Sequence, residues 1–149
     1  MNNRTDRVRA DIAAFGWHVV KVLGESDLPE FAYTVGLTNS YAHPEVIMFG
    51  APLDFMHKTL NVIGSAAKGG ARFETGRPYS SIIKGFDCCF QEFPKNQYSA
   101  LLGCALGFYE HDNFSALQCF WPDAAGLFPW DPGADRDCVA LQPYFYREA

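Results

Sequence analysis

Residues 45–70 read EVIMFGAPLDFMHKTLNVIGSAAKGG, an apolar strand pattern followed directly by an amphipathic helix pattern. The run Glu45–Phe49 is almost continuously apolar, which is typical of a central strand covered on both faces. Apolar residues then recur at i, i+4, i+7 and i+11 and predict the buried face of a helix: Met56, Leu60, Ile63 and Ala67. The stretch therefore predicts a helix that packs against a sheet through these side chains.

Further strand and helix patterns lie on both sides of this stretch. Apolar periodicity predicts two more helices, at residues 3–15 and 98–109, the first packing on the sheet. Strands are predicted at residues 17–23, 31–35, 72–74, 82–83, 86–93, 114–121 and 138–141. The first two pair as a hairpin, and the strand at 45–49 crosses over through the helix to a parallel strand at 72–74.

The length and the order of these elements indicate the fold class. A chain of 149 residues fits one domain better than two. The uneven order of helices and strands predicts an α+β fold, a single compact domain over residues 1–149. We expect three helices and a mixed, mostly antiparallel sheet of about five to seven short strands, because most connections are short.

Charge and hydropathy exclude several classes of function. Lys and Arg total 12 against 17 Asp and Glu, a net charge of −5, which argues against a nucleic-acid-binding surface. No stretch reaches the roughly 18–20 apolar residues of a membrane span, and the N-terminus lacks the order of a signal peptide, so we expect a cytoplasmic protein without membrane contact. Five cysteines without a CxxC pair indicate free thiols, and the side chains of Cys88 and Cys89 point to opposite faces of a strand.

Four sequence motifs occur in a fixed order along the chain. They are FAYTVGL at residues 31–37, HPEVIMFG at 43–50, LQCFWPD at 117–123 and FPWDP at 128–132. This series resembles the DUF4262 family, small bacterial proteins named for lacking an assigned function, and the resemblance runs from residue 16 to residue 143. It implies a compact single domain and supplies no catalytic residues.

The histidines are candidates for catalysis, although they form no metal-ligand motif, and we expect no metal and no cofactor. They lie in four separate predicted elements, at His18, His43, His57 and His111. His43 and Glu45 flank Pro44, where a loop enters the buried strand, and the two side chains can reach a common metal or act as an acid–base pair. In the structural alternative, His43 and Pro44 shape the loop and Glu45 faces solvent.

The C-terminal third places aromatic, amide and carboxylate groups around one proline-rich turn. Gln118 precedes this turn, and Trp121, Asp123 and Trp130 lie within it. Two indoles held by prolines can form the floor of a site for a planar or aliphatic ligand, with Gln118 or Asp123 fixing its polar end. In the structural alternative, both Trp side chains fill the bottom of the sheet while Asp123 and Asp131 cap the turn.

Arg77 and Tyr79 are a further pair of candidate binding residues. They follow Gly76 in a predicted turn, where an exposed guanidinium can clamp a carboxylate or a phosphate. Alternatively, Arg77 pairs with Glu74 or Asp87 on the surface and contributes little.

A single cleft would unite most of these candidates. We expect the segment at 31–44 to approach the segment at 118–130. The cleft would then be lined by Tyr33, His43, Gln118, Trp121, Asp123 and Trp130.

Two functions from different classes remain open. The first is a binding or interaction module that recognises a small molecule, a peptide or a protein partner through this aromatic-lined cleft. The second is a small hydrolase or lyase in which His43 with Glu45, or His111 with Asp112, forms the acid–base pair.

The surroundings of the histidines discriminate between the two functions. Convergence of one His–carboxylate pair with Tyr33 and Gln118 in a pocket would favour the enzyme, and a shallow groove with scattered histidines would favour the module. The aromatic content of 15% is compatible with a homodimer, but the sequence specifies no interface.

Overall fold

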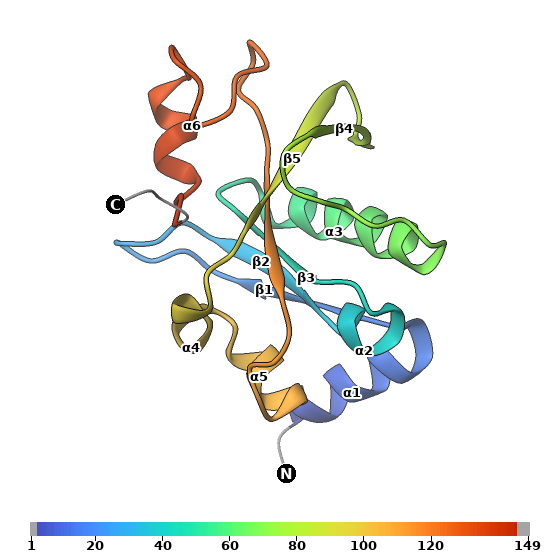
Figure 1. Ribbon diagram of the computed structural model, residues 1–149. Coiled ribbons are helices and arrows are strands. Elements are labelled where there is room, and N and C mark those ends of the chain that lie inside the picture. Colours follow the sequence, from blue (N-terminus) through green and yellow to red (C-terminus); the bar gives the residue numbers. More distant parts are fainter. Residues whose placement is uncertain (1–2, 146–149) are drawn as a thin grey trace.

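A six-stranded sheet in the order β1-β2-β3-β6-β5-β4 organises the computed structural model, which describes residues 3–145 (Figure 1). The strands are β1 (His18–Val22), β2 (Phe31–Val35), β3 (Glu45–Phe49), β4 (Pro78–Ile83), β5 (Phe86–Glu92) and β6 (Ala116–Phe120). Neighbouring strands are antiparallel except for β3 and β6, which are parallel. This arrangement confirms the α+β class and the mostly antiparallel sheet, but the described residues form six α-helices and not the three predicted.

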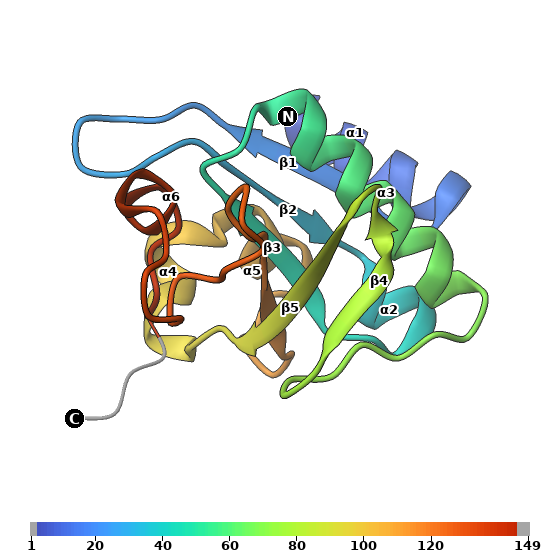
Figure 2. The ribbon, with the colours of Figure 1, turned by 90° about the horizontal axis from the view of Figure 1, so that it is seen from above.

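Helices cover both faces of the sheet. They are α1 (Asn3–Phe15), α2 (Leu37–Tyr41), α3 (Leu53–Lys68), α4 (Tyr98–Leu101), α5 (Gly103–Tyr109) and α6 (Arg136–Leu141), with a 3-10 turn at Lys95–Gln97. Figure 1 shows α3 above strands β1, β2 and β3, and α1, α4 and α5 below them. Seen from above, α1 and α3 both lie beside β1 (Figure 2).

The central strand β3 divides the interior into two apolar cores because its side chains alternate between the faces. Val46 and Met48 pack in the core under α3, and Ile47 and Phe49 pack in the core next to α1, α4 and α5. All five residues of β3 are buried, which confirms the central strand predicted at 45–49. The predicted inner face of α3 is also confirmed: Met56, Leu60 and Ile63 have no exposed surface.

The parallel partner of β3 was predicted wrongly. Residues 72–74 form no strand, and β3 instead pairs with β6, with Ile47 opposite Gln118. A side chain explains the difference, because the backbone N–H of Phe73 donates to Nε2 of His43. The predicted hairpin of the first two strands is confirmed by the antiparallel pairing of β1 with β2.

Three other segments differ from the sequence-based prediction. In each of them, a side-chain oxygen accepts backbone N–H groups of the segment. Residues 138–141 lie in the helix α6, whose start is capped by the carboxylate of Asp135, and do not form an edge strand. The helix predicted at 98–109 is interrupted at Leu102, where the hydroxyl of Tyr33 accepts the N–H of Cys104. The predicted loop at 36–44 contains α2, whose first N–H groups bind Glu45.

Candidate functional site

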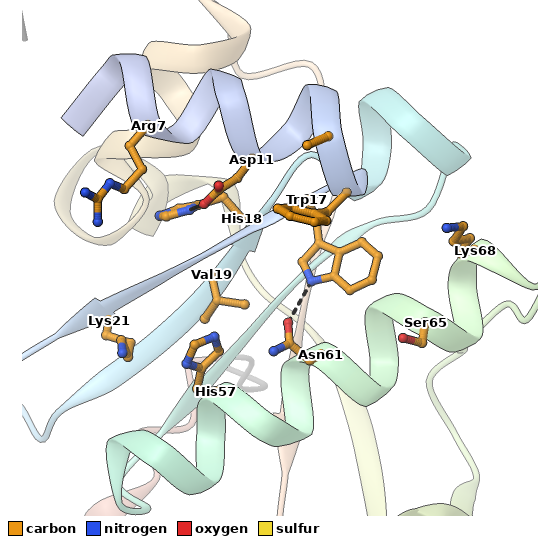
Figure 3. A pocket seen from close by; sticks show the side chains of 12 residues that line it. Arg7, Asp11, Trp17, His18, Val19, Lys21, His57, Asn61, Ser65 and Lys68 are labelled. Atoms are coloured by element: carbon orange, nitrogen blue, oxygen red, sulfur yellow. Dashed lines mark hydrogen bonds and ion pairs between the residues drawn. The ribbon is translucent and has the colours of Figure 1, made fainter. Parts of the chain in front are cut away.

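A surface groove of about 680 Å³ runs along β1, the strand at one end of the sheet (Figure 3). We call it the β1 groove. It is lined by Arg7, Asp11, Ala14 and Phe15 of α1, by Trp17, His18, Val19 and Lys21 of the β1 segment, and by His57, Asn61, Ser65 and Lys68 of α3. Because α1 and α3 cover opposite faces of the sheet, the two helices wall the groove and β1 lies between them.

Helical spacing explains why these side chains share one groove. On α3, the lining residues are His57, Asn61, Ser65 and Lys68, which recur every three or four positions and therefore share one face of the helix. This polar stripe runs beside the apolar stripe that contacts the sheet. Helix α1 presents Arg7, Asp11 and Ala14 in the same manner.

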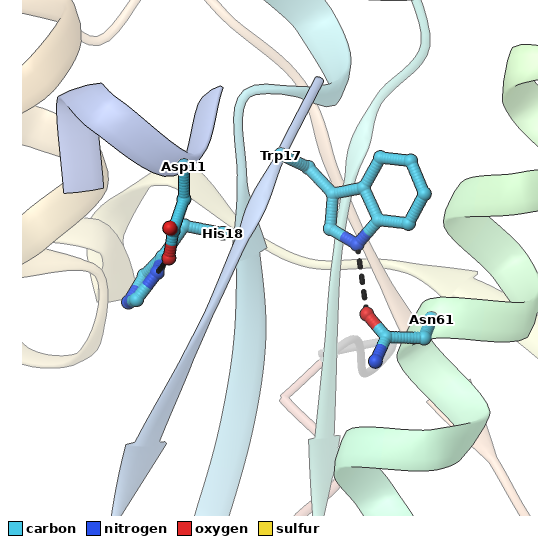
Figure 4. Close-up of polar contacts among 4 residues, drawn as sticks. All are labelled: Asp11, Trp17, His18 and Asn61. Carbon is cyan, nitrogen blue, oxygen red and sulfur yellow. Dashed lines mark hydrogen bonds and ion pairs between the residues drawn. The ribbon is translucent and has the colours of Figure 1, made fainter. Parts of the chain in front are cut away.

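Trp17 is held in a fixed position on the α3 side of the groove (Figure 4). Its indole Nε1–H donates to Oδ1 of Asn61 at 2.9 Å, and the ring of Tyr41 meets it edge-on at a centroid distance of 6.3 Å. A Cβ atom at Gly64 would lie 2.5 Å from the indole, so glycine is required for this close approach. The groove therefore has a rigid aromatic wall.

The groove also contains a His–carboxylate pair. Nδ1 of His18 lies 2.6 Å from a carboxylate oxygen of Asp11, and both side chains are partly exposed (Figure 4). Across the groove, burial lowers the pKa of His57, and the nearby charge of Lys21 lowers it further. An anion bound beside His57 would oppose this effect because a negative charge stabilises the imidazolium.

The charge of the groove is opposite in sign to that of the chain. Its lining carries three cationic side chains, Arg7, Lys21 and Lys68, and one carboxylate, Asp11, a formal charge of +2 with both histidines neutral. The whole chain has a formal charge of −5. Such local concentration of one sign attracts ligands of the other sign.

Glu45 is buried, so the alternative in which it faces solvent is wrong. Its carboxylate accepts hydrogen bonds from the hydroxyl of Thr34, from the phenol of Tyr109 and from the backbone N–H groups of Gly36, Leu37 and Thr38. Burial raises the pKa of Glu45, and these donors oppose the rise. All five donors belong to the fold, which gives this carboxylate a structural role.

His43 is likewise occupied by the fold. Its Nε2 accepts the N–H of Phe73 at 3.1 Å, which leaves Nδ1 to donate to the carbonyl of Pro44 at 2.8 Å. Burial lowers the pKa of His43 and so favours this neutral form. His111 is exposed, and its Nδ1 accepts the N–H of Asn113. These bonds do not join His43 to Glu45 or His111 to Asp112, the carboxylates predicted as their partners.

The predicted residues of the C-terminal turn make internal bonds. Nε2 of Gln118 donates to the carbonyl of Pro143, and Nε1 of Trp121 donates to the carbonyl of Phe49. Asp123 accepts three backbone N–H groups of the turn, and the pKa of its carboxyl is lowered by them. The ring of Trp130 stacks on Phe128.

Arg77 and Tyr79 meet as a pair. The guanidinium of Arg77 donates to the Tyr79 hydroxyl at 3.1 Å and lies 4.8 Å from the centre of its ring. The Tyr79 hydroxyl also accepts the N–H of Glu74. Arg77 therefore contacts an aromatic ring and not the carboxylates of Glu74 or Asp87 that the alternative interpretation named.

The structure does not bring the predicted site residues into one cleft. Tyr33 and Gln118 lie level on either side of Ile47, on the face next to α5. His43, however, precedes β3, and Trp121 follows β6. Because these parallel strands are in register, the two residues lie beyond opposite ends of a five-residue strand, and the strand alone separates them by about 17 Å along its length.

Sequence reasoning missed the β1 groove because it depends on tertiary contacts. Asp11 and His18 belong to different elements, and only the turn at Gly16, with a φ of 101°, brings them together. The one available signal was the polar spacing of His57, Asn61 and Ser65 beside the apolar stripe of α3. Within residues 3–145, no group of three or more His, Cys, Asp or Glu side chains could hold a metal ion.

Comparison with known proteins gives a family and no function. The model of the family described as "Domain of unknown function (DUF4262)" matches residues 11–135. No curated protein and no solved structure matches the chain. In the described part of the chain, no helix is long and apolar enough to span a membrane. Since the family model covers most of the sequence, the chain belongs to the DUF4262 family.

Proposed function

We propose that this member of the DUF4262 family is a binding module and that it takes an anionic ligand in the β1 groove. The observation that carries the proposal is the formal charge of +2 in a groove of a chain with a charge of −5. The volume of about 680 Å³ supports it, because ligand sites typically measure about 300–1,000 Å³.

The lining residues have separate roles in this proposal. Arg7, Lys21 and Lys68 attract the anion, and His57 becomes a fourth cation once a bound negative charge favours its protonation. Trp17 offers a fixed apolar surface that loses little entropy on binding, because Asn61 and the helix backbone already hold it. A cytoplasmic location is part of the proposal, since all five cysteines are free thiols.

Titration with pyrophosphate and with citrate, followed by NMR of ¹⁵N-labelled protein, tests this function. Shifts should concentrate in α1, β1 and α3 around the groove and should weaken at high salt. Lys21→Glu should raise the apparent dissociation constant at least about threefold, because attraction is replaced by repulsion. The matched control is Lys84→Glu, at an exposed position between β4 and β5. Equal weakening by both variants, or no shifts in the groove, would refute the proposal.

A hydrolase or lyase is the second candidate, and the contact of Asp11 with His18 favours it. A carboxylate that bonds one imidazole nitrogen orients the ring and fixes its tautomer, as a general acid–base group requires. This pair replaces the pairs predicted at His43 and His111. Turnover of a chromogenic ester that disappears in His18→Gln and persists in His111→Gln would support the enzyme.

A further inference from the structure

One long edge of β1 faces the groove without a neighbouring strand. In the sheet order β1-β2-β3-β6-β5-β4, β1 pairs with β2 on one side, and no other strand within residues 3–145 lies on its other side. Val19 and Lys21 of this strand both line the groove. An edge strand offers unpaired N–H and C=O groups to any further extended chain.

The ladder between β2 and β3 shows which backbone groups of β1 are free. The N–H of Gly50 donates to the carbonyl of Glu30. Because backbone hydrogen bonds in an antiparallel ladder involve every second residue, the even-numbered residues of β2 are the ones hydrogen-bonded to β3. The odd-numbered residues of β2 therefore bond β1, and their partners are His18, Val20 and Val22. By alternation, the N–H and C=O groups of Val19 and Lys21 point away from the sheet and into the groove.

The other edge of the sheet is closed to such pairing. Strand β4 begins with Pro78, which has no N–H, and its ladder with β5 shifts register between Tyr79 and Ile83. Proline and bulges are common devices that block an edge strand. The segment His18–Val22 contains neither.

Charge indicates which extended chain would fit. The side chains of Lys21, His57 and Lys68 belong to the α3 side of the groove, and Arg7 lies on the α1 side. Successive side chains of an added strand would alternate between these two walls. A peptide with a carboxylate at every second residue would place its negative charges towards α3, against Lys21 and Lys68.

We propose that an acidic peptide in extended conformation binds this groove as an additional strand on β1. The inference rests on the proposed function and names its ligand class. Backbone bonds to Val19 and Lys21 would give affinity, and the basic wall would select acidic residues. Pairing with the β1 strand of a second copy is disfavoured because two lysine-bearing edges would then face each other.

Amide hydrogen exchange and NMR test the inference with a blocked eight-residue peptide of alternating Glu and Val. The amides of Val19 and Lys21 should exchange fast in the free protein and at least about tenfold more slowly with saturating peptide. A peptide of alternating Lys and Val, and one N-methylated at every second backbone nitrogen, serve as matched controls. Both controls should bind at least about tenfold more weakly, as should the acidic peptide to Lys68→Glu, which reverses a charge on the α3 wall.

Each other outcome overturns a defined step. Equal binding of the N-methylated peptide, with shifts at Trp17 but no protection of Val19, would overturn strand addition and leave an anion-binding groove. Binding of pyrophosphate in the groove without binding of any peptide would do the same. Protection of both amides without peptide, together with a dimeric mass, would replace the peptide with a second copy of the chain. Absence of binding by every anionic probe would overturn the proposed function itself.

Discussion

Tyr109 donates a hydrogen bond from its phenol to the carboxylate of Glu45, across 64 residues of sequence. The bond joins the end of α5 to the start of β3. The same carboxylate holds the first N–H groups of α2. One buried acid therefore connects three elements at this end of the sheet, and its removal should affect the whole fold.

Tyr109→Phe should lower the free energy of unfolding by about 1–3 kcal/mol, because a charged acceptor loses a buried donor. Glu45→Gln should cost at least as much, since an amide NH₂ would face backbone N–H groups that need an acceptor. Urea denaturation measures both, with the exposed Glu110→Gln as a control that should change little. A loss below about 0.5 kcal/mol in both variants would contradict the structural role of Glu45.

The elements that the sequence predicted well are those whose evidence is local. The apolar run 45–49 and the stripe of Met56, Leu60 and Ile63 report burial directly, and the structure confirms both. The errors occur where a distant side chain takes a backbone partner. His43 binds the N–H of Phe73, thirty residues away, and thereby replaces the predicted strand. The periodicity of apolar residues along the sequence cannot indicate a contact between residues that far apart.

The candidate site shows the same limit more clearly. Residue types indicated that Asp123 and Asp131 could cap their turn, and both carboxylates accept backbone N–H groups there. The pairing of Asp11 with His18 depends instead on how α1 folds back over β1. Chemical candidates can be recognised from sequence, but which of them meet is decided by topology.

The stability of the protein should depend on the protonation of His43. In the folded state, burial lowers the pKa of this imidazole below its ordinary value of 6.5, so the unfolded chain binds the proton more readily. Stability from the neutral ring is therefore present above pH 6.5 and is lost as the pH falls below it. His43→Gln, which can still accept the N–H of Phe73, should lose less stability between pH 7.5 and 5 than the wild type does. An unchanged loss would contradict the prediction, and His111→Gln is the control.

Replacement of two helical glycines should have opposite effects. Gly64→Ala places a Cβ 2.5 Å from the indole of Trp17. We therefore expect the free energy of unfolding to fall by about 1–3 kcal/mol and the fluorescence emission of Trp17 to shift. Gly107→Ala, in open space within α5, should raise the free energy of unfolding by up to about 1 kcal/mol, because alanine has the higher helix propensity. Denaturation and fluorescence of both variants measure this. A stabilised Gly64→Ala with unchanged emission would show that Trp17 is free to move.

The five thiols should differ in their reaction with DTNB at pH 8. Cys88 and Cys119 are fully buried, and a hydrogen bond with the Cys88 thiol, together with burial, raises the pKa of Cys119, so both should react only on unfolding. Burial raises the pKa of Cys89 to about 11, which leaves about one thiolate in a thousand, and this partly exposed thiol should react slowly. Cys104 is also partly exposed and should react first, and Cys138 should follow, because burial raises the pKa of this partly exposed thiol as well.

Single Cys→Ser variants assign each phase of this reaction to one thiol. The unfolded chain in guanidinium should give the full count of five and provides the reference. Rapid native labelling of Cys119 would contradict its burial on β6, within the core under α3. It would also reopen nucleophilic catalysis by a cysteine, because only an accessible thiolate attacks a substrate.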